Sequence, residues 1–168
     1  MPTSYRVAPT DPHPSARRGT LPRMRPVQIT FDAQDPGRLA TFWAAALGDR
    51  GYRVPDPPDG AADWPGWLAA RGVPEDQWNA ASAVESTDPA QPRLYFQRVP
   101  ELKTVKNRVH LDLQAGGGPS VPAAEQQQRI DAAVERLTAL GATFVEARSG
   151  LGVHWAVLQD PEGNEFCT

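Results

Sequence analysis

Residues 27–48, VQITFDAQDPGRLATFWAAALG, decide the fold because they are typical of a strand followed at once by an amphipathic helix. Apolar and polar residues alternate over 27–33, as in a strand with one buried face. Asp35 stands at the expected N-cap of the helix and Pro36 at its first position. Apolar residues then recur at helical spacing from Leu39 until a glycine ends the helix. The stretch predicts a strand and a helix that share one core.

Three further strands are expected in the first half of the chain, at 51–54, Ser82–Glu85 and Arg93–Val99. An insertion, residues 55–81, separates the first two of these strands and is rich in Pro, Gly and Trp. We interpret it as short helical turns that fold over the edge of the core. Its tryptophans either anchor this packing or form the wall of a ligand pocket.

The second half of the chain repeats this order. A strand is expected over Val109–Ala115, a helix that ends at Gly141, and strands at Ala142–Glu146, Val153–Gln159 and Asn164–Thr168. Both predicted helices end in Ala-Leu-Gly. The repeat predicts an α+β fold of two βαβββ modules, residues 26–100 and 107–168, that form an open mixed barrel around a cleft.

Composition narrows the classes of partner. The chain of 168 residues has a net charge of -3 and no apolar run long enough to span a membrane, so we expect a small-molecule ligand rather than a nucleic acid or a membrane. The single cysteine, Cys167, cannot form an internal disulfide, which favours a cytoplasmic location. Residues 1–25 combine prolines and arginines without a hydrophobic period, and we predict a disordered tail before a domain at 26–168.

Three segments, residues 35–43, 94–99 and 160–167, resemble the glyoxalase-like branch of the vicinal-oxygen-chelate superfamily, which also includes bleomycin resistance proteins and dioxygenases. The resemblance extends from about residue 27 to the end and implies the two-module fold. It does not name a reaction, because the superfamily includes isomerases, lyases, dioxygenases, thiol transferases and antibiotic-sequestering binders.

The resemblance also implies one metal ligand on the first and one on the fourth strand of each module. The residues that match these positions are Gln28, Gln97, His110 and Cys167, and Glu165 shares the strand face of Cys167. The four matched residues include no carboxylate, whereas Mg²⁺ and Mn²⁺ prefer negatively charged oxygen ligands. We therefore expect either a divalent metal at Gln28, Gln97, His110 and Glu165 or, as the residue types favour, no cofactor.

Two residues are candidates for acid/base catalysis. His110 and Glu165 would form a proton-transfer pair if the cleft raises the carboxyl group's affinity for a proton. The alternative is that Glu165 is a rim carboxylate bound to backbone or arginine. Asp112 either orients the His110 imidazole or belongs to a polar stripe. Cys167 has no cation near it in sequence and is interpreted as a small packing residue.

Two functions follow from these residues. The first is a lyase or isomerase that binds a small oxygenated or aromatic metabolite in the cleft between the modules, with Gln28, Gln97, Tyr95, Trp67 and His154 as binding residues. The second is a non-catalytic, antibiotic-sequestering binder that stacks a planar ligand on Trp64, Trp67, Trp78, Tyr95 and Phe96. A homodimer is compatible with both.

Overall fold

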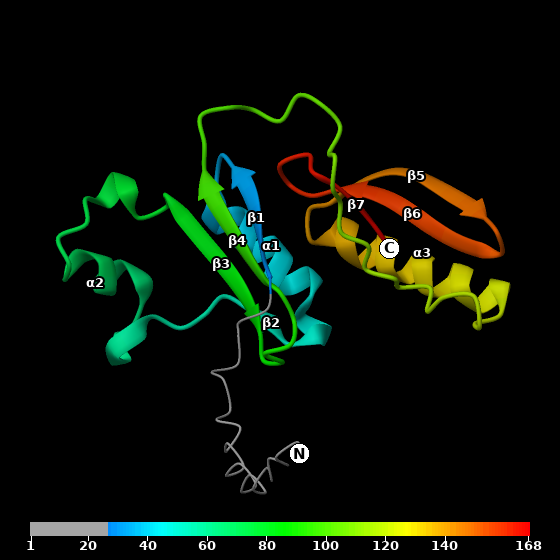
Figure 1. Ribbon diagram of the computed structural model, residues 1–168, viewed down its shortest axis with the longest axis horizontal. Helices are drawn as coiled ribbons and strands as arrows, with labels where there is room; N and C mark the ends of the chain where they lie inside the picture. The colour runs from blue at the N-terminus through cyan, green and yellow to red at the C-terminus, as the bar shows by residue number, and fades with distance from the viewer. Residues whose placement is uncertain (1–26) are drawn as a thin grey trace, which may run out of the picture.

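The computed structural model describes residues 27–168 and shows two α+β units side by side (Figure 1). The first unit runs from β1 to β4 and the second from the segment before α3 to β7. The expected disordered tail, residues 1–25, lies outside the described residues. Among the residues described, none of the helices has the length and apolar character that a membrane crossing requires.

The first unit is a four-stranded sheet covered on one face by a helix. Its elements are β1 (Gln28–Ala33), α1 (Pro36–Ala46), β2 (Tyr52–Arg53), α2 (Trp64–Ala69), β3 (Ala81–Ser86) and β4 (Arg93–Arg98). The strand order is β1-β4-β3-β2, with β1 parallel to β4 and the other pairs antiparallel. The strands predicted for this half are confirmed, and β1 lies at one edge of the sheet.

Helix α1 begins and ends where the sequence predicts. The Asp35 side chain accepts a hydrogen bond of 3.1 Å from the backbone N–H of Arg38, which caps the first turn. Its apolar face carries Leu39, Phe42 and Trp43 into the core, where all three are buried. This burial fixes the helix against β3 and β4 and leaves the opposite face of the sheet open.

The insertion between β2 and β3 consists of α2 and two short 3-10 turns, Pro58–Gly60 and Glu75–Gln77. Figure 1 shows it projecting beyond β3 at the left of the molecule. None of the residues in these three elements is fully buried, so the insertion adds no core of its own. The expectation of short helical turns at the edge of the core is confirmed.

The second unit packs one helix on a three-stranded antiparallel sheet. Its elements are α3 (Ala123–Ala139), β5 (Thr143–Gly150), β6 (Val153–Gln159) and β7 (Glu165–Cys167), in the order β5-β6-β7. Ile130 and Leu137 on α3 are buried in the core. The predicted helix and the last three predicted strands are confirmed.

The strand predicted over Val109–Ala115 was wrong. Asp112 forms a single parallel bridge to Cys167, with main-chain hydrogen bonds of 2.8 Å on either side of it. The carbonyl of Leu113 accepts a hydrogen bond from an arginine side chain of the first unit instead of continuing a ladder. Gln114 then has a φ of 50°, so the extended chain stops after one bridge.

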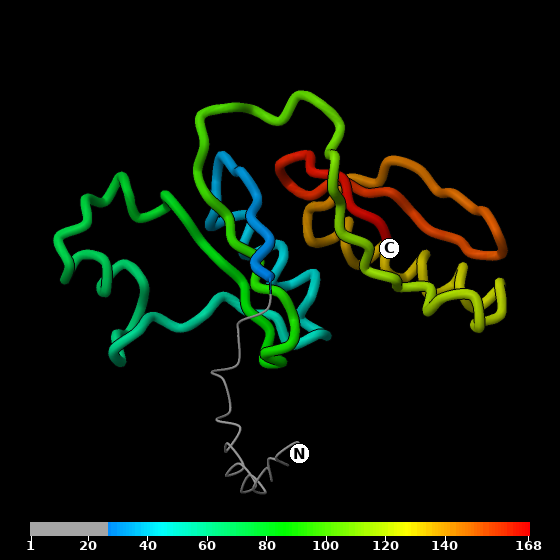
Figure 2. Tube along the Cα trace, viewed as in Figure 1, coloured from blue at the N-terminus to red at the C-terminus, as the bar shows by residue number. Residues whose placement is uncertain are grey.

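The two sheets share no ladder within the described residues and form no closed barrel. The units are joined instead by the core and by the turn before β7. The Phe166 ring packs 5.2 Å from the Trp43 ring between centroids. The Glu162 carboxylate accepts hydrogen bonds from the backbone N–H groups of Gln34 (2.7 Å) and Asp35 (2.6 Å) at the start of α1. Figure 2 shows the linker from β4 passing over the top from one unit to the other.

Candidate functional site

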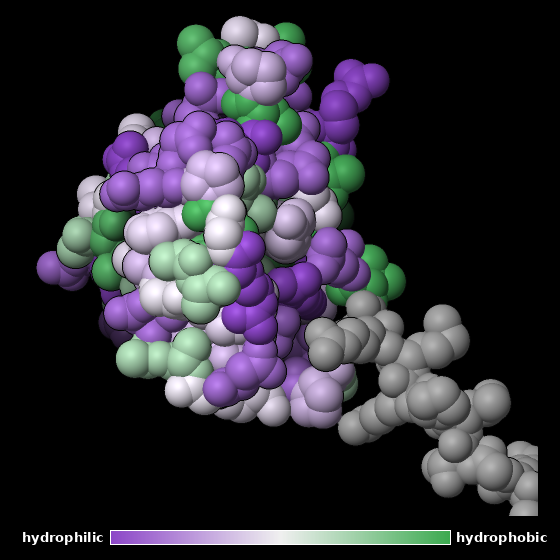
Figure 3. All heavy atoms as spheres, turned by 90° about the vertical axis from the view of Figure 1, so that its left-hand side faces the viewer, coloured by the Kyte–Doolittle hydropathy of each residue, from purple (hydrophilic) through white to green (hydrophobic). Residues whose placement is uncertain are grey.

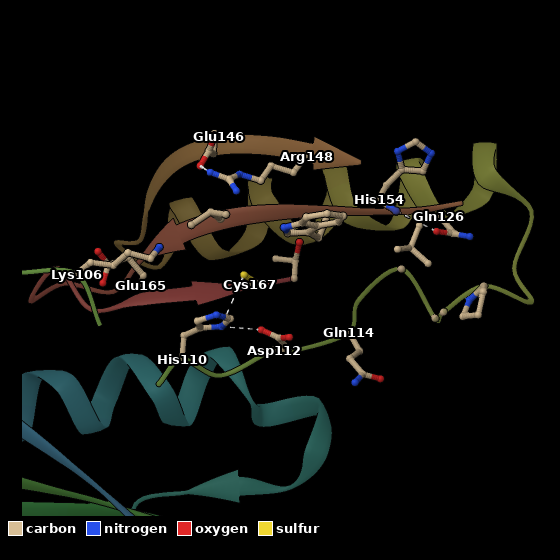
Figure 4. Close-up of a pocket in the computed structure, with 18 residues that line it drawn as sticks. Lys106, His110, Asp112, Gln114, Gln126, Glu146, Arg148, His154, Glu165 and Cys167 are labelled. Carbon is tan, nitrogen blue, oxygen red and sulfur yellow. Dashed lines mark hydrogen bonds and ion pairs between the residues drawn. The ribbon is translucent and has the colours of Figure 1, made fainter. Parts of the chain in front are cut away.

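The open face of the second sheet forms a cavity of about 570 Å³. Strands β6 and β7 line one side, and the segment from Lys106 to Pro119 lines the other (Figure 4). A second cavity of about 380 Å³ lies between the two units, beneath the linker. His110 lines both cavities, which places its imidazole where the expected cleft between the modules meets the open sheet face.

A cluster of three side chains forms the polar centre of the larger cavity. The bridge between Asp112 and Cys167 holds His110, Asp112 and Cys167 close together. His110 Nδ1 lies 2.9 Å from Asp112 Oδ1 and 3.9 Å from Cys167 Sγ. Figure 4 shows the imidazole beside both the carboxylate and the thiol. Because an ionised carboxylate can only accept, Nδ1 carries the proton and Nε2 of the neutral ring is left as an acceptor.

Cys167 is a protonated thiol near neutral pH. Burial raises its pKa, and the charge and hydrogen bond of Asp112 raise it further. Lys106 and Arg148 oppose this shift without reversing it. The thiol is therefore not activated as a nucleophile. It is more than the packing residue that we expected, because it lines the cavity beside His110 and Asp112.

Glu165 is held away from the cluster by the linker. Its Oε2 accepts hydrogen bonds from Lys103 Nζ (3.1 Å) and from the backbone N–H of Asn107 (3.0 Å). Burial favours the neutral carboxyl group, but these two donors outweigh burial and lower the pKa of Glu165. The expectation that the cleft raises its affinity for a proton was wrong, because the donors come from a segment about 60 residues away in the sequence.

The two glutamines predicted as ligands lie on the open face of the first sheet and line neither cavity. Gln28 Oε1 accepts a hydrogen bond of 2.9 Å from Arg93, and Gln97 Nε2 donates one of 2.8 Å to Asp32. Strand register also changes the expected correspondence between the modules. Because Gln28 matches His110, Thr30 matches Asp112, two residues later in each module. Thr30 pairs with Tyr95, and Asp112 pairs with Cys167, so the counterpart of Cys167 is Tyr95 rather than Gln97.

Two other predicted binding residues face away from the cavity centre. His154 lines the far end of the same cavity, but it is on the face of β6 that packs on α3, and Figure 4 shows its ring pointing away from His110. Its neighbour Trp155 is on the opposite, open face of β6 and lines the cavity. The Trp67 ring is covered by Arg71, whose guanidinium carbon lies 3.7 Å from the ring centroid.

The residues of one chain do not fit the implied metal site. The expected set is divided between the two units, and Glu165 bonds to the linker. The trio His110, Asp112 and Cys167 places its donor atoms within 4.8 Å of one another, but it offers only one carboxylate, which already bonds to the imidazole. Mg²⁺ and Mn²⁺ require more charged oxygen donors, and zinc would require the thiol to lose its proton.

Sequence reasoning missed the cationic side of the cavity. Lys106 lies in the linker, and Arg148 on β5 forms an ion pair of 2.5 Å with Glu146. The buried Gln126 of α3 also lines the cavity. The alternation of β5 places Glu146 and Arg148 on one strand face, a signal that pointed to this pair but not to its cavity.

Comparison with known proteins gives a consistent fold. Residues 28–168 match the family model described as a glyoxalase-like domain. A hypothetical protein from S. aureus is 15% identical and has a TM-score of 0.51, over 84% of this chain and 89% of that chain. A glyoxalase/bleomycin resistance protein/dioxygenase family enzyme from Burkholderia phytofirmans PsJN is 14% identical with a TM-score of 0.51, over 83% and 93%.

A third similar structure is a mutant of the fosfomycin resistance protein FosX from Listeria monocytogenes, complexed with Mn(II) and 1S,2S-dihydroxypropylphosphonic acid. It is 11% identical with a TM-score of 0.50, over 83% of this chain and 84% of that chain. No curated protein matches the sequence. At these identities the similar structures show the fold alone.

Proposed function

Because the chain belongs to the glyoxalase-like domain family, we propose that it binds a small oxygenated metabolite around His110 and moves a proton on it, as a lyase or isomerase does. The observation that carries the proposal is the hydrogen bond of 2.9 Å between His110 Nδ1 and Asp112. This bond fixes the tautomer and leaves Nε2 as the proton acceptor.

The rest of the cavity supports an oxygenated ligand. Lys106 and Arg148 line the same space as His110, and their N–H groups can donate hydrogen bonds to a carbonyl or hydroxyl oxygen. Arg148 is paired with Glu146, and Asp112 and Glu165 also line the cavity, so the lining favours an uncharged oxygenated ligand over a carboxylate. The volume of about 570 Å³ falls within the range of small-molecule sites. His110 would accept the proton, Asp112 would stabilise the imidazolium that forms, and the protonated Cys167 would donate a hydrogen bond to the ligand.

The test is exchange of substrate hydrogen with solvent. The wild-type protein is incubated in D₂O with a panel of hydroxyketones, and loss of the hydrogen next to the carbonyl is followed by proton NMR. We expect exchange with the wild type, none above background with His110→Ala, and exchange slowed by about 10-fold or more with Asp112→Asn, since general-base catalysis typically contributes 10²–10⁴-fold.

Gln128→Ala is the control because Gln128 is exposed on α3 and does not line either cavity, and this variant should exchange like the wild type. Exchange that persists in His110→Ala would contradict the proposal. Binding of a panel member without exchange, detected by line broadening of its signals and lost in His110→Ala, would favour the second candidate, a non-catalytic ligand-sequestering protein. The protonated thiol and the poor fit of these residues to the implied metal are compatible with that alternative.

A further inference from the structure

A separate pocket lies between the insertion and the open face of the first sheet. Its volume is about 380 Å³, and it is lined by side chains of the insertion and of strands β3 and β4, among them Trp64, Leu68, Trp78, Ala83, Arg93 and Tyr95. None of these residues lines the cavity around His110. Figure 3 looks onto this side of the molecule, where hydrophobic residues occur in small groups among hydrophilic ones. This side of the molecule therefore has a confined pocket and not a broad apolar face.

Aromatic rings form one wall of this pocket. Trp64 Nε1 donates a hydrogen bond of 2.8 Å to the Pro55 carbonyl, and Trp78 Nε1 donates one of 2.9 Å to the Val73 carbonyl. The polar atoms of both indoles are thus satisfied within the insertion, and both tryptophans remain only half-buried. The carbon surface of the rings is what the pocket presents, a surface on which another ring can stack.

Among the described residues that line the pocket, Arg93 is the only charged one, and it is already paired with a carboxylate. Arg93 Nε lies 2.8 Å from Glu85 Oε1, and Arg93 Nη1 donates to Gln28. Because this charge is balanced, the described lining does not favour an anionic ligand. Tyr95 lies beside Arg93, and its hydroxyl has no hydrogen-bond partner among the residues that the structure describes. This hydroxyl, like that of Ser82 in the same lining, can bond to an oxygen of a ligand.

We propose that this pocket is a second ligand site, which takes an uncharged planar aromatic molecule of about two rings bearing one oxygen, such as a naphthol. The rings pack against Trp64 and Trp78, and the oxygen bonds to the Tyr95 hydroxyl. The site is independent of the chemistry proposed at His110. Its floor is Ala83, whose small side chain pairs across the ladder with Tyr95 and leaves the space that the ligand fills.

The probe is 2-naphthol, titrated into the full chain and followed by the indole N–H signals of the five tryptophans in nitrogen-correlated NMR. Cyclohexanol, which has one hydroxyl but no planar ring, is the comparison compound. We expect 2-naphthol to shift the signals of Trp64 and Trp78 in a saturable way, and cyclohexanol to bind at least about 10-fold more weakly because it cannot stack. Equal binding of the two compounds would overturn the planar class of ligand.

Two variants test whether 2-naphthol binds in this pocket. Ala83→Leu fills the pocket and should weaken 2-naphthol binding by about 10-fold or more, whereas Ala132→Leu, an exposed alanine of α3, should not change it. Tyr95→Phe keeps the ring and should weaken binding by about fivefold, the loss of one hydrogen bond. It also tests the site if Ala83→Leu does not fold.

His110→Ala separates this proposal from the proposed function. Binding of 2-naphthol should be unchanged in this variant, even if solvent exchange is abolished. Loss of 2-naphthol binding in His110→Ala, or retention in both Ala83→Leu and Tyr95→Phe, would place the molecule elsewhere and overturn the second site.

Discussion

Asp35 shows how a single residue connects sequence, pKa and stability. Its carboxylate accepts hydrogen bonds from the Asn79 side chain (2.8 Å) and from the backbone N–H of Arg38 (3.1 Å). The Asn79 hydrogen bond, followed by the Arg38 hydrogen bond, lowers the pKa of Asp35 below 3.8. The ionised form is therefore stabilised by folding.

We predict that Asp35→Ala lowers the free energy of unfolding by about 1 kcal/mol at pH 7, the usual value for a helix N-cap. Because the folded pKa is lowered, the contribution is present above the unfolded pKa and is lost as the pH falls through the folded pKa. Urea denaturation at pH 7 and at successively lower pH values should show the difference from wild type shrinking below 3.8. Asp49→Ala, at an exposed position, is the control; a constant difference at all pH values would contradict the assignment.

Residue roles were predictable when the partners are close in sequence. The Asp35 cap and the pairing of His110 with Asp112 span three and two residues, so spacing alone brings their atoms together. Glu165 was misjudged because its partners, Lys103 and Asn107, come from the linker. Spacing carries no information about such a contact.

Gln126 is the polar contact that fixes α3 as an element. It is 2% exposed, and its Nε2 donates a hydrogen bond of 2.7 Å to the Val121 carbonyl while its Oε1 accepts one of 3.3 Å from the backbone N–H of His154. The helix is thereby joined both to the loop before it and to β6. Position 126 is four residues before the buried Ile130 and therefore lies on the same helix face, but this spacing does not explain why a glutamine is there.

We predict that Gln126→Leu lowers the free energy of unfolding by about 2 kcal/mol, because the partly buried Val121 carbonyl and His154 N–H lose their partner. Gln128→Leu, at an exposed position of the same helix, should change it by less than about 0.5 kcal/mol. Thermal and urea denaturation of both variants measure the difference. An equal effect of the two substitutions would mean that the buried hydrogen bonds contribute nothing.

Strands and helices were predictable where periodicity and local capping agree, as in β1 and α1. The segment Val109–Ala115 has the same alternation as β1, but the neighbour it would pair with, β7, is only three residues long. An arginine of the first unit and the positive φ of Gln114 end the pairing after one bridge. Alternation reports a preference for extended backbone, whereas a ladder needs a partner whose length the pattern does not give.

In the whole molecule, two edge segments of similar sequence have no ladder partner on their outer side among the described residues. Strand β1 is one edge of the first sheet, and residues 109–115 border β7 at one edge of the second. The repeat predicted two modules that pair edge to edge, but the two sheets of one chain share no ladder among the described residues. Val27 and Val109, at the starts of these two edge segments, are each 77% exposed. Unpaired edges with exposed apolar residues are templates for another chain.

We therefore expect a homodimer in which β1 of each copy pairs with residues 109–115 of the other, a twofold arrangement that uses both edges of both chains. Light scattering on a sizing column should give twice the chain mass of 18.2 kDa. Val109→Lys should shift the protein toward monomer, because the two copies would then bury a charge at the paired edges. Leu151→Lys, at a fully exposed hairpin position, should remain dimeric. A wild-type protein that stays at 18.2 kDa at all concentrations would show that these edges do not pair between copies, and a Val109→Lys variant that dimerises equally well would place the interface elsewhere.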